Sequence, residues 1–120
     1  MESDKIFHDW LIVYLQRFLS KEYTGIAINL QGQEKNEFSG HYPDMILKSY
    51  GMVMAVMEVE TEGSITPGQA ARWKSLTGQG AKLMLMVPER SKAKVMNLLW
   101  ELGIAADVAV GGYELKVSMP

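Results

Sequence analysis

The stretch MVMAVMEVE, residues 52–60, decides how this chain folds. From Met52 to Met57 it is apolar without alternation, which is typical of a central strand covered on both faces. Polarity then changes abruptly at Glu58 and Glu60. Because residues two apart on a strand project to the same face, we expect these two carboxylates to lie side by side. The sequence therefore predicts acidic side chains at the end of a buried strand.

Periodicity and turn residues divide the rest of the chain into helices and strands. Helices are expected at about residues 5–19, 66–76 and 91–102, and strands at about 26–30, 41–47, 82–87, 106–110 and 113–117. The Gly111-Gly112 dipeptide between the last two strands is typical of a tight hairpin. The early strands suit an antiparallel meander, and the strands that flank the later helices suit parallel crossovers. We therefore expect one α/β domain over residues 1–120, a mixed sheet with helices on both faces.

Composition narrows the chemistry that such a domain can perform. The 120 residues include no cysteine, which excludes disulfides, thiolate metal sites and cysteine nucleophiles. With only two histidines, a catalytic metal would be held mainly by carboxylates, which suits Mg²⁺ or Mn²⁺. The net charge of −2 lacks the basic excess that is usual in nucleic-acid-binding proteins. No segment has the pattern of a signal peptide or a membrane span, so we expect a soluble, cytoplasmic protein without a membrane partner.

A third carboxylate is expected beside the first two. Asp44 lies on the strand that precedes residues 52–60, and a tight turn between the two strands brings it opposite Glu58 and Glu60. Three carboxylates at the end of a buried sheet repel one another unless a cation is present. This argues for a divalent metal site; the alternative is that the acidic residues are simply solvated at a strand end.

Three short motifs lie at the predicted strand and helix ends: Pro43-Asp44, Glu58-x-Glu60 and Gln69-x-x-x-Trp73. Together they resemble the motifs of the PD-(D/E)xK nuclease superfamily. The expected order of elements is also similar to the α-β-β-β-α-β core of that superfamily, over nearly the whole chain. The resemblance implies a restriction-endonuclease-like fold, here with a further C-terminal helix and hairpin.

The resemblance also implies an activity, the metal-dependent hydrolysis of DNA phosphodiester bonds. Asp44, Glu58 and the backbone carbonyl of Val59 would be ligands of Mg²⁺ or Mn²⁺. Glu60 and Gln69 would stand at catalytic positions. Trp73 would occupy an aromatic position that usually holds tyrosine.

One position departs from the superfamily's pattern. The motif lysine, which helps to position or activate the attacking water, is replaced by Glu60, and the charge is reversed. Some restriction enzymes of this fold carry glutamate there, and elsewhere the lysine has moved, which makes Lys48 and Lys74 candidates. Whether this chain is an enzyme is therefore open. The alternatives are a degenerate, non-catalytic member that acts in binding or assembly, and a carboxylate metal-binding module unrelated to nucleic acids.

Several nominated side chains also have structural interpretations. Gln69 is the N3 residue of a predicted capping box that begins at Thr66 and continues through Pro67. Trp73 suits a core position, and Asp9 suits either a solvated helix face or the acidic residue that many superfamily members supply from the first helix.

Basic residues that can contact DNA phosphates, or can simply be solvated, form one further set: Arg72, Lys74, Arg90, Lys92 and Lys94. A minimal core of this kind is expected to act as a homodimer or beside a partner protein.

Overall fold

The computed structural model describes residues 2–120, with side chains from Asp4 onward. Its helices are α1 (Glu2–Leu19), α2 (Pro67–Leu76) and α3 (Lys92–Leu102). Its strands are β1 (Gly25–Ile28), β2 (Met45–Ser49), β3 (Met52–Val59), β4 (Lys82–Pro88) and β5 (Val108–Tyr113). Single 3₁₀ turns cover Glu62–Ser64, Glu89–Ser91 and Ala105–Asp107. Within the described residues, no helix is both long and apolar enough to cross a membrane.

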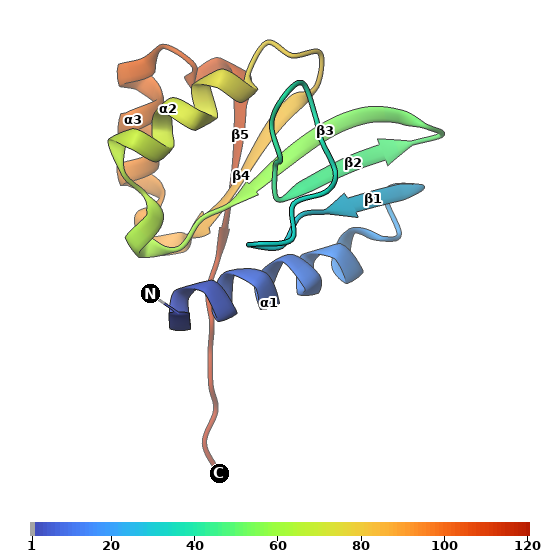
Figure 1. The fold of residues 1–120 in the computed structure, drawn as a ribbon. Helices are drawn as coiled ribbons and strands as arrows, with labels where there is room; N and C mark the ends of the chain where they lie inside the picture. Colours follow the sequence, from blue (N-terminus) through green and yellow to red (C-terminus); the bar gives the residue numbers. More distant parts are fainter. Residues whose placement is uncertain (1) are drawn as a thin grey trace.

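The five strands form one mixed sheet in the order β1-β2-β3-β4-β5 (Figure 1). β1, β2 and β3 are antiparallel neighbours, whereas β3, β4 and β5 run parallel. The predicted meander and the two predicted parallel crossovers are thus confirmed. A parallel strand needs a crossover connection, and α2 and α3 supply the two that this sheet requires.

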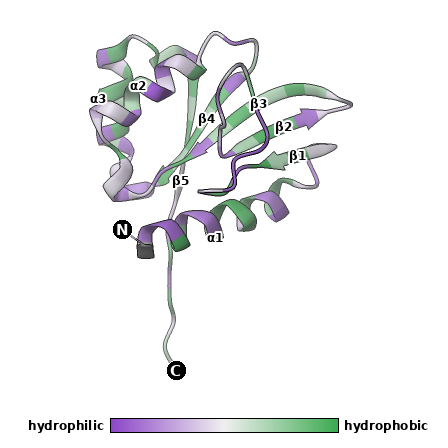
Figure 2. Cartoon of the chain, in the orientation of Figure 1, coloured by the Kyte–Doolittle hydropathy of each residue, from purple (hydrophilic) through white to green (hydrophobic). Residues whose placement is uncertain are grey.

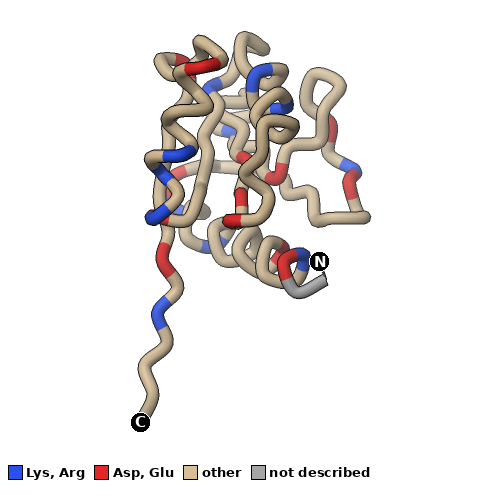
Figure 3. The backbone as a smooth tube through the Cα atoms, turned by 90° about the vertical axis from the view of Figure 1, so that its left-hand side faces the viewer, with Lys and Arg blue, Asp and Glu red and all other residues tan. Residues whose placement is uncertain are grey.

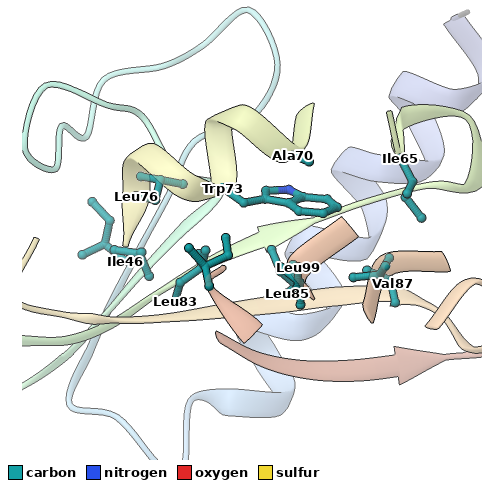
Figure 4. Close-up of a cluster of buried hydrophobic side chains, with 12 residues drawn as sticks. Ile46, Ile65, Ala70, Trp73, Leu76, Leu83, Leu85, Val87 and Leu99 are labelled. Carbon is teal, nitrogen blue, oxygen red and sulfur yellow. The ribbon is translucent and has the colours of Figure 1, made fainter. Parts of the chain in front are cut away.

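Helices cover both faces of the sheet, as the apolar run in β3 predicts (Figures 1 and 2). Alternate β3 residues face opposite sides: Val56 packs with α2 and α3, and Met57 packs with α1. On the α2 side, the indole of Trp73 lies over β4 with Leu83, Leu85 and Val87 beneath it (Figure 4). The α1 side is filled by Leu11, Ile12, Leu15, Leu19, Met45, Leu47, Ala55, Met57 and Val59.

The start of α2 follows its predicted cap only in part. The Thr66 hydroxyl accepts a hydrogen bond from the backbone N–H of Gln69 at 3.1 Å, and Pro67 occupies the first turn. The Gln69 side chain, however, does not bond back to Thr66. It donates to Glu60 at 2.9 Å instead, because a buried carboxylate is a stronger hydrogen-bond acceptor than any group of Thr66. This exchange ties α2 to the end of β3.

The predicted C-terminal hairpin is wrong. Gly111 and Gly112 lie inside β5, paired with Met86 and Val87, and neither has the positive φ of a tight hairpin turn. Their missing side chains serve packing instead, since a Cβ on Gly112 would stand 1.8 Å from the Glu89 carboxylate. The residues after Tyr113 form no strand.

The second strand also begins later than predicted, at Met45 rather than near His41. Pro43 has no N–H to give to a ladder, and His41 pairs only with Phe38 in an isolated bridge. The Asp44 carboxylate takes the N–H of Val59, which a β2 backbone carbonyl would otherwise receive. The departure from regular pairing therefore occurs at the candidate site.

The core on the α2 side gives a first prediction. Leu85 is 1 % exposed on β4, the strand beside the central one, so Leu85→Ala leaves a cavity and should lower the free energy of unfolding by about 2–5 kcal/mol. The matched control Met52→Ala alters a side chain that is 68 % exposed and should change stability by less than about 0.5 kcal/mol. Urea denaturation followed by circular dichroism measures both. Equal losses would mean that Leu85 of β4 is not buried in the core.

Candidate functional site

A polar cavity of about 400 Å³ opens at the end of β3, where α1, β2 and α2 meet. Six of the residues that the sequence nominates line it: Asp44, Glu58, Val59, Glu60, Gln69 and Arg72. The convergence follows from the fold, because the start of β2 pairs with the end of β3 and the crossover into α2 begins just beyond it.

Asp44 and Glu58 hold one another in place through the backbone. The N–H of Asp44 donates to Glu58 Oε2 at 2.9 Å, and the N–H of Val59 donates to Asp44 Oδ2 at 2.7 Å. Each carboxylate thus accepts a charge-assisted hydrogen bond from the neighbouring strand. The Asp44 side chain keeps 16 % of its surface exposed, so it opens onto the cavity, whereas Glu58 is buried.

Arg72 is the cation that faces Glu58. Its Nε donates to Glu58 Oε1 at 2.5 Å, and a terminal nitrogen donates to the carbonyl of Tyr42 at 2.9 Å. Burial raises the pKa of Glu58 to about 7, the charge of Asp44 adds to the rise, and Arg72 offsets it only in part. Burial lowers the pKa of Arg72, but Glu58 outweighs that effect and raises it. Glu58 is therefore a buried carboxyl with incomplete charge compensation.

His8, on α1, bridges two carboxylates. Its Nε2 lies 3.1 Å from Asp44 Oδ2, and its Nδ1 lies 3.1 Å from Asp9 Oδ1. Burial disfavours the imidazolium, but the hydrogen bonds and charges of Asp44 and Asp9 outweigh it and raise the pKa of His8 to about 9. A protonated ring donates through both nitrogens, which matches the two acceptors. Asp9 also accepts from the N–H of Gln31 at 3.3 Å, so it is not a solvated helix residue.

Glu60 belongs to a second arrangement on the α2 side of the same cavity. It is 1 % exposed, and Ser64 donates to its Oε1 at 2.7 Å. Gln69 and Trp73 both donate to its Oε2 at 2.9 Å. Burial raises the pKa of Glu60, and these three donors partly counter the rise. Both carboxylate oxygens are therefore engaged by protein donors, and Trp73 serves the core and this carboxylate together.

Asn29 holds the backbone of Pro43 and Asp44 in position. Its N–H donates to the carbonyl of Asp44 at 3.0 Å, and its amide donates to the carbonyl of Pro43 at 2.7 Å. The same side chain closes the preceding loop, because its Oδ1 accepts from the N–H groups of Lys35 and Asn36. Nothing in the sequence distinguishes this asparagine from a surface turn residue, although it is 2 % exposed.

Oxygen atoms at the cavity wall suit a divalent cation. Asp44, Glu58 and the Val59 carbonyl offer the hard oxygen atoms that Mg²⁺ and Mn²⁺ prefer. In the described part of the chain, no three His, Cys, Asp or Glu side chains are grouped so that they could hold a metal ion. A site here therefore relies on two carboxylates plus backbone and solvent oxygen, and Arg72 competes for Glu58.

A lysine that the sequence analysis missed reaches the cavity. Lys5 of α1 lines it, whereas Lys48 and Lys74, the two candidates from the sequence, are not among the residues of its wall. Helical spacing could have revealed Lys5, since Lys5, His8 and Ile12 recur at three- and four-residue intervals on one face of α1.

The other predicted DNA contacts lie outside this cavity. Arg90 pairs with Glu62, and Lys92 approaches Glu89 at 3.6 Å. Lys74 and Lys94 are exposed. Figure 3 shows acidic and basic residues interspersed along the chain. These four basic side chains therefore belong to a surface of mixed charge and do not form a basic patch at the cavity.

Comparisons with known proteins identify no relative: no family model, curated protein or solved structure matches this chain.

The pKa values of Glu58 and His8, raised to about 7 and about 9, predict how stability depends on pH, and the raised pKa of Glu60 acts in the same direction. The contribution of Glu58 is fully present below its ordinary pKa of 4.5 and is lost as the pH rises through about 7. That of His8 is fully present below 6.5 and is lost through about 9. In buffers with a chelator, the free energy of unfolding should fall from about pH 5 to about pH 9, by at most about 1.4 kcal/mol per pH unit for each group.

Variants assign the two parts of that pH profile. Glu58→Gln should flatten the lower part and His8→Gln the upper part, while Glu101→Gln, at an exposed position of α3, should leave the profile unchanged. Thermal unfolding across the pH range measures all three. A wild-type stability that rises between pH 5 and pH 9 would contradict both assignments.

Proposed function

We propose that this chain is a small metal-dependent endonuclease-like protein of the restriction-endonuclease-like fold, which hydrolyses DNA phosphodiester bonds. The observation that carries the proposal is the meeting of Asp44 and Glu58 at the end of a buried sheet, on the wall of an open polar cavity. The mixed order of the strands and the position of this pair at adjacent strand ends support the proposal. DNA is the proposed substrate.

Asp44, Glu58 and the carbonyl of Val59 would hold Mg²⁺ or Mn²⁺. The fit rests on the chemistry of the donors, because two carboxylates and a backbone carbonyl on the wall of the polar cavity offer the oxygen atoms that these ions prefer. A divalent cation supplies Lewis-acid polarisation of phosphate and lowers the pKa of water. Arg72 has a half-exposed side chain, so it can leave Glu58 for an anionic phosphate without unfolding the core.

The chain's own residues divide the remaining tasks. Lys5 supplies a positive charge at the cavity wall and takes over the task of the motif lysine, with Arg72 as a second phosphate contact. Gln69 and Trp73 hold Glu60, so this carboxylate braces β3 against α2. His8 orients Asp44 by donating to its Oδ2. Lys74, Arg90, Lys92 and Lys94 would extend the contact to DNA.

A second function is favoured by one specific feature. Protein donors engage both oxygens of Glu58 and both oxygens of Glu60, so the cluster is satisfied without any metal. A degenerate member of the fold that binds or assembles, with no catalysis, accounts for this equally. Metal binding and cleavage separate the two functions.

Asp44→Asn tests the metal site. It keeps the shape of the side chain but removes a charge, and should weaken Mn²⁺ binding by at least about 100-fold in calorimetry and abolish cleavage of supercoiled, branched and single-stranded DNA. The control Asp107→Asn changes an exposed aspartate in the turn before β5 and should retain both. Mn²⁺ binding without cleavage in the wild type would favour the non-catalytic function. Cleavage that survives Asp44→Asn would contradict the nuclease.

Lys5→Met tests the replacement of the motif lysine. Loss of the ammonium group at the cavity should lower the cleavage rate by about 100-fold or more while Mn²⁺ affinity changes little. Lys21→Met serves as the matched control, because Lys21 is exposed outside the cavity and is not a proposed DNA contact, and it should retain activity within about twofold. If Lys5→Met cleaves normally and Lys74→Met is inactive instead, Lys5 has no catalytic part.

A further inference from the structure

The outer face of α1 is apolar and open. The inner face of this helix packs on the sheet through Leu11, Ile12, Leu15 and Leu19. On the other side, four large side chains recur every four residues: Ile6 is 66 % exposed, Trp10 49 %, Tyr14 52 % and Phe18 65 %. We call these four residues the outer stripe. A helix that covers one sheet should have a polar outer face, so this one is built for a further contact.

The C-terminal segment, residues 114–120, has a matching character. It leaves β5 as an extended segment and runs away from the body of the protein (Figure 1). Its apolar residues alternate, with Leu115, Val117 and Met119 all exposed. An extended segment with period-two alternation presents one apolar edge. This edge, like the outer stripe, has no cover within the described chain.

The two apolar surfaces border the same hollow at one end. Ile6, Phe7, Trp10 and Leu115 line a shallow apolar hollow of about 400 Å³. Aromatic rings continue from this hollow along α1, since the ring centroids of Trp10 and Tyr14 lie 5.6 Å apart and stacked. The stripe and the segment therefore adjoin at this hollow, and the rest of the segment extends beyond it.

The size of this surface matches an interface between proteins. Its seven large side chains are 49–80 % exposed, so at about 150–250 Å² for each side chain they present on the order of 700–1,100 Å² together. Stable interfaces bury about 800 Å² on each partner, whereas the largest apolar patch of a typical monomer covers about 300–600 Å². The surface is large enough to bind one partner stably.

We infer that a second copy of this chain covers the surface, with the two α1 helices packed antiparallel across a two-fold axis that passes midway between Trp10 and Tyr14. The outer stripe is symmetric about that point. Antiparallel pairing sets Ile6 of one copy opposite Phe18 of the other, and Trp10 opposite Tyr14. The outer stripe of one copy therefore packs against the outer stripe of the other. Residues 114–120 of each copy then lie along the α1 helix of the other. The interface is formed by the same residues in both copies, and the dimer needs neither metal nor DNA.

Light scattering after size exclusion tests the dimer. At micromolar concentration the wild type should have twice the 13.4 kDa mass of one chain, and the double variant Trp10→Glu/Phe18→Glu should be monomeric with an unchanged far-UV spectrum. Trp100→Glu is the matched control, because Trp100 is 71 % exposed on α3 across the sheet, and it should remain dimeric. Deletion of residues 115–120 should weaken the dimer at least tenfold.

Disulfide trapping tests the arrangement, since the chain has no cysteine of its own. Mixed Ile6→Cys and Phe18→Cys copies should cross-link on oxidation, whereas Phe18→Cys copies alone should not. A monomeric wild type, which leaves the surface to a different protein or to DNA, would overturn the inference. So would a dimer that survives Trp10→Glu/Phe18→Glu, or one that Trp100→Glu disrupts equally. Self-cross-linking of Phe18→Cys would overturn the antiparallel pairing.

Discussion

The reciprocal bonding of Asp44 and Glu58 is the constraint on which the rest of the site depends. Glu58 is 1 % exposed, and an ionised carboxylate at such a position is costly unless donors surround it. The N–H of Asp44 and the guanidinium of Arg72 are those donors, and the N–H of Val59 completes the exchange. This bonding fixes where β2 begins, holds the two strand ends together and draws α2 toward the sheet through Arg72.

Charge alternates along the cavity, and this alternation explains how the cluster persists in a folded chain. His8 lies between Asp9 and Asp44, and Arg72 faces Glu58. The weakest compensation is at the contact between Asp44 and Glu58, where two anions are neighbours and the pKa of Glu58 rises to about 7. Glu60 is satisfied separately by Ser64, Gln69 and Trp73. Asp44 and Glu58 are therefore the two carboxylates that lie directly together, and this pair is the basis of the proposed metal site.

How far the sequence predicts this structure depends on whether the controlling contact is local. The apolar run of β3 predicts a strand buried on both faces, and it is. Gly111-Gly112 predicts a hairpin, because the local signal does not show that Glu89 lies over Gly112 in a continuous strand. Similarly, the capping box around Gln69 is half formed, since a carboxylate nine residues earlier in the chain captures the side chain.

The residues of the candidate site also fall into those that local sequence predicts and those that depend on tertiary contacts. Acidic spacing places Asp44 and Glu58 together, but the contributions of α1 depend on how that helix crosses the sheet. The inner side of α1 presents Lys5 and His8 to the cavity. The outer side of the same helix carries the exposed stripe from Ile6 to Phe18. One helix thus joins the cavity to the proposed dimer surface, and its amphipathic pattern alone does not separate these two sides.

Anomalous diffraction from crystals soaked in Mn²⁺ can locate a cation beside Asp44 and Glu58. We expect one strong peak bounded by the Asp44 and Glu58 carboxylates and the Val59 carbonyl, with the guanidinium of Arg72 displaced from Glu58. Absence of a peak there, with Arg72 still bonded to Glu58 at saturating Mn²⁺, would contradict the proposed metal site.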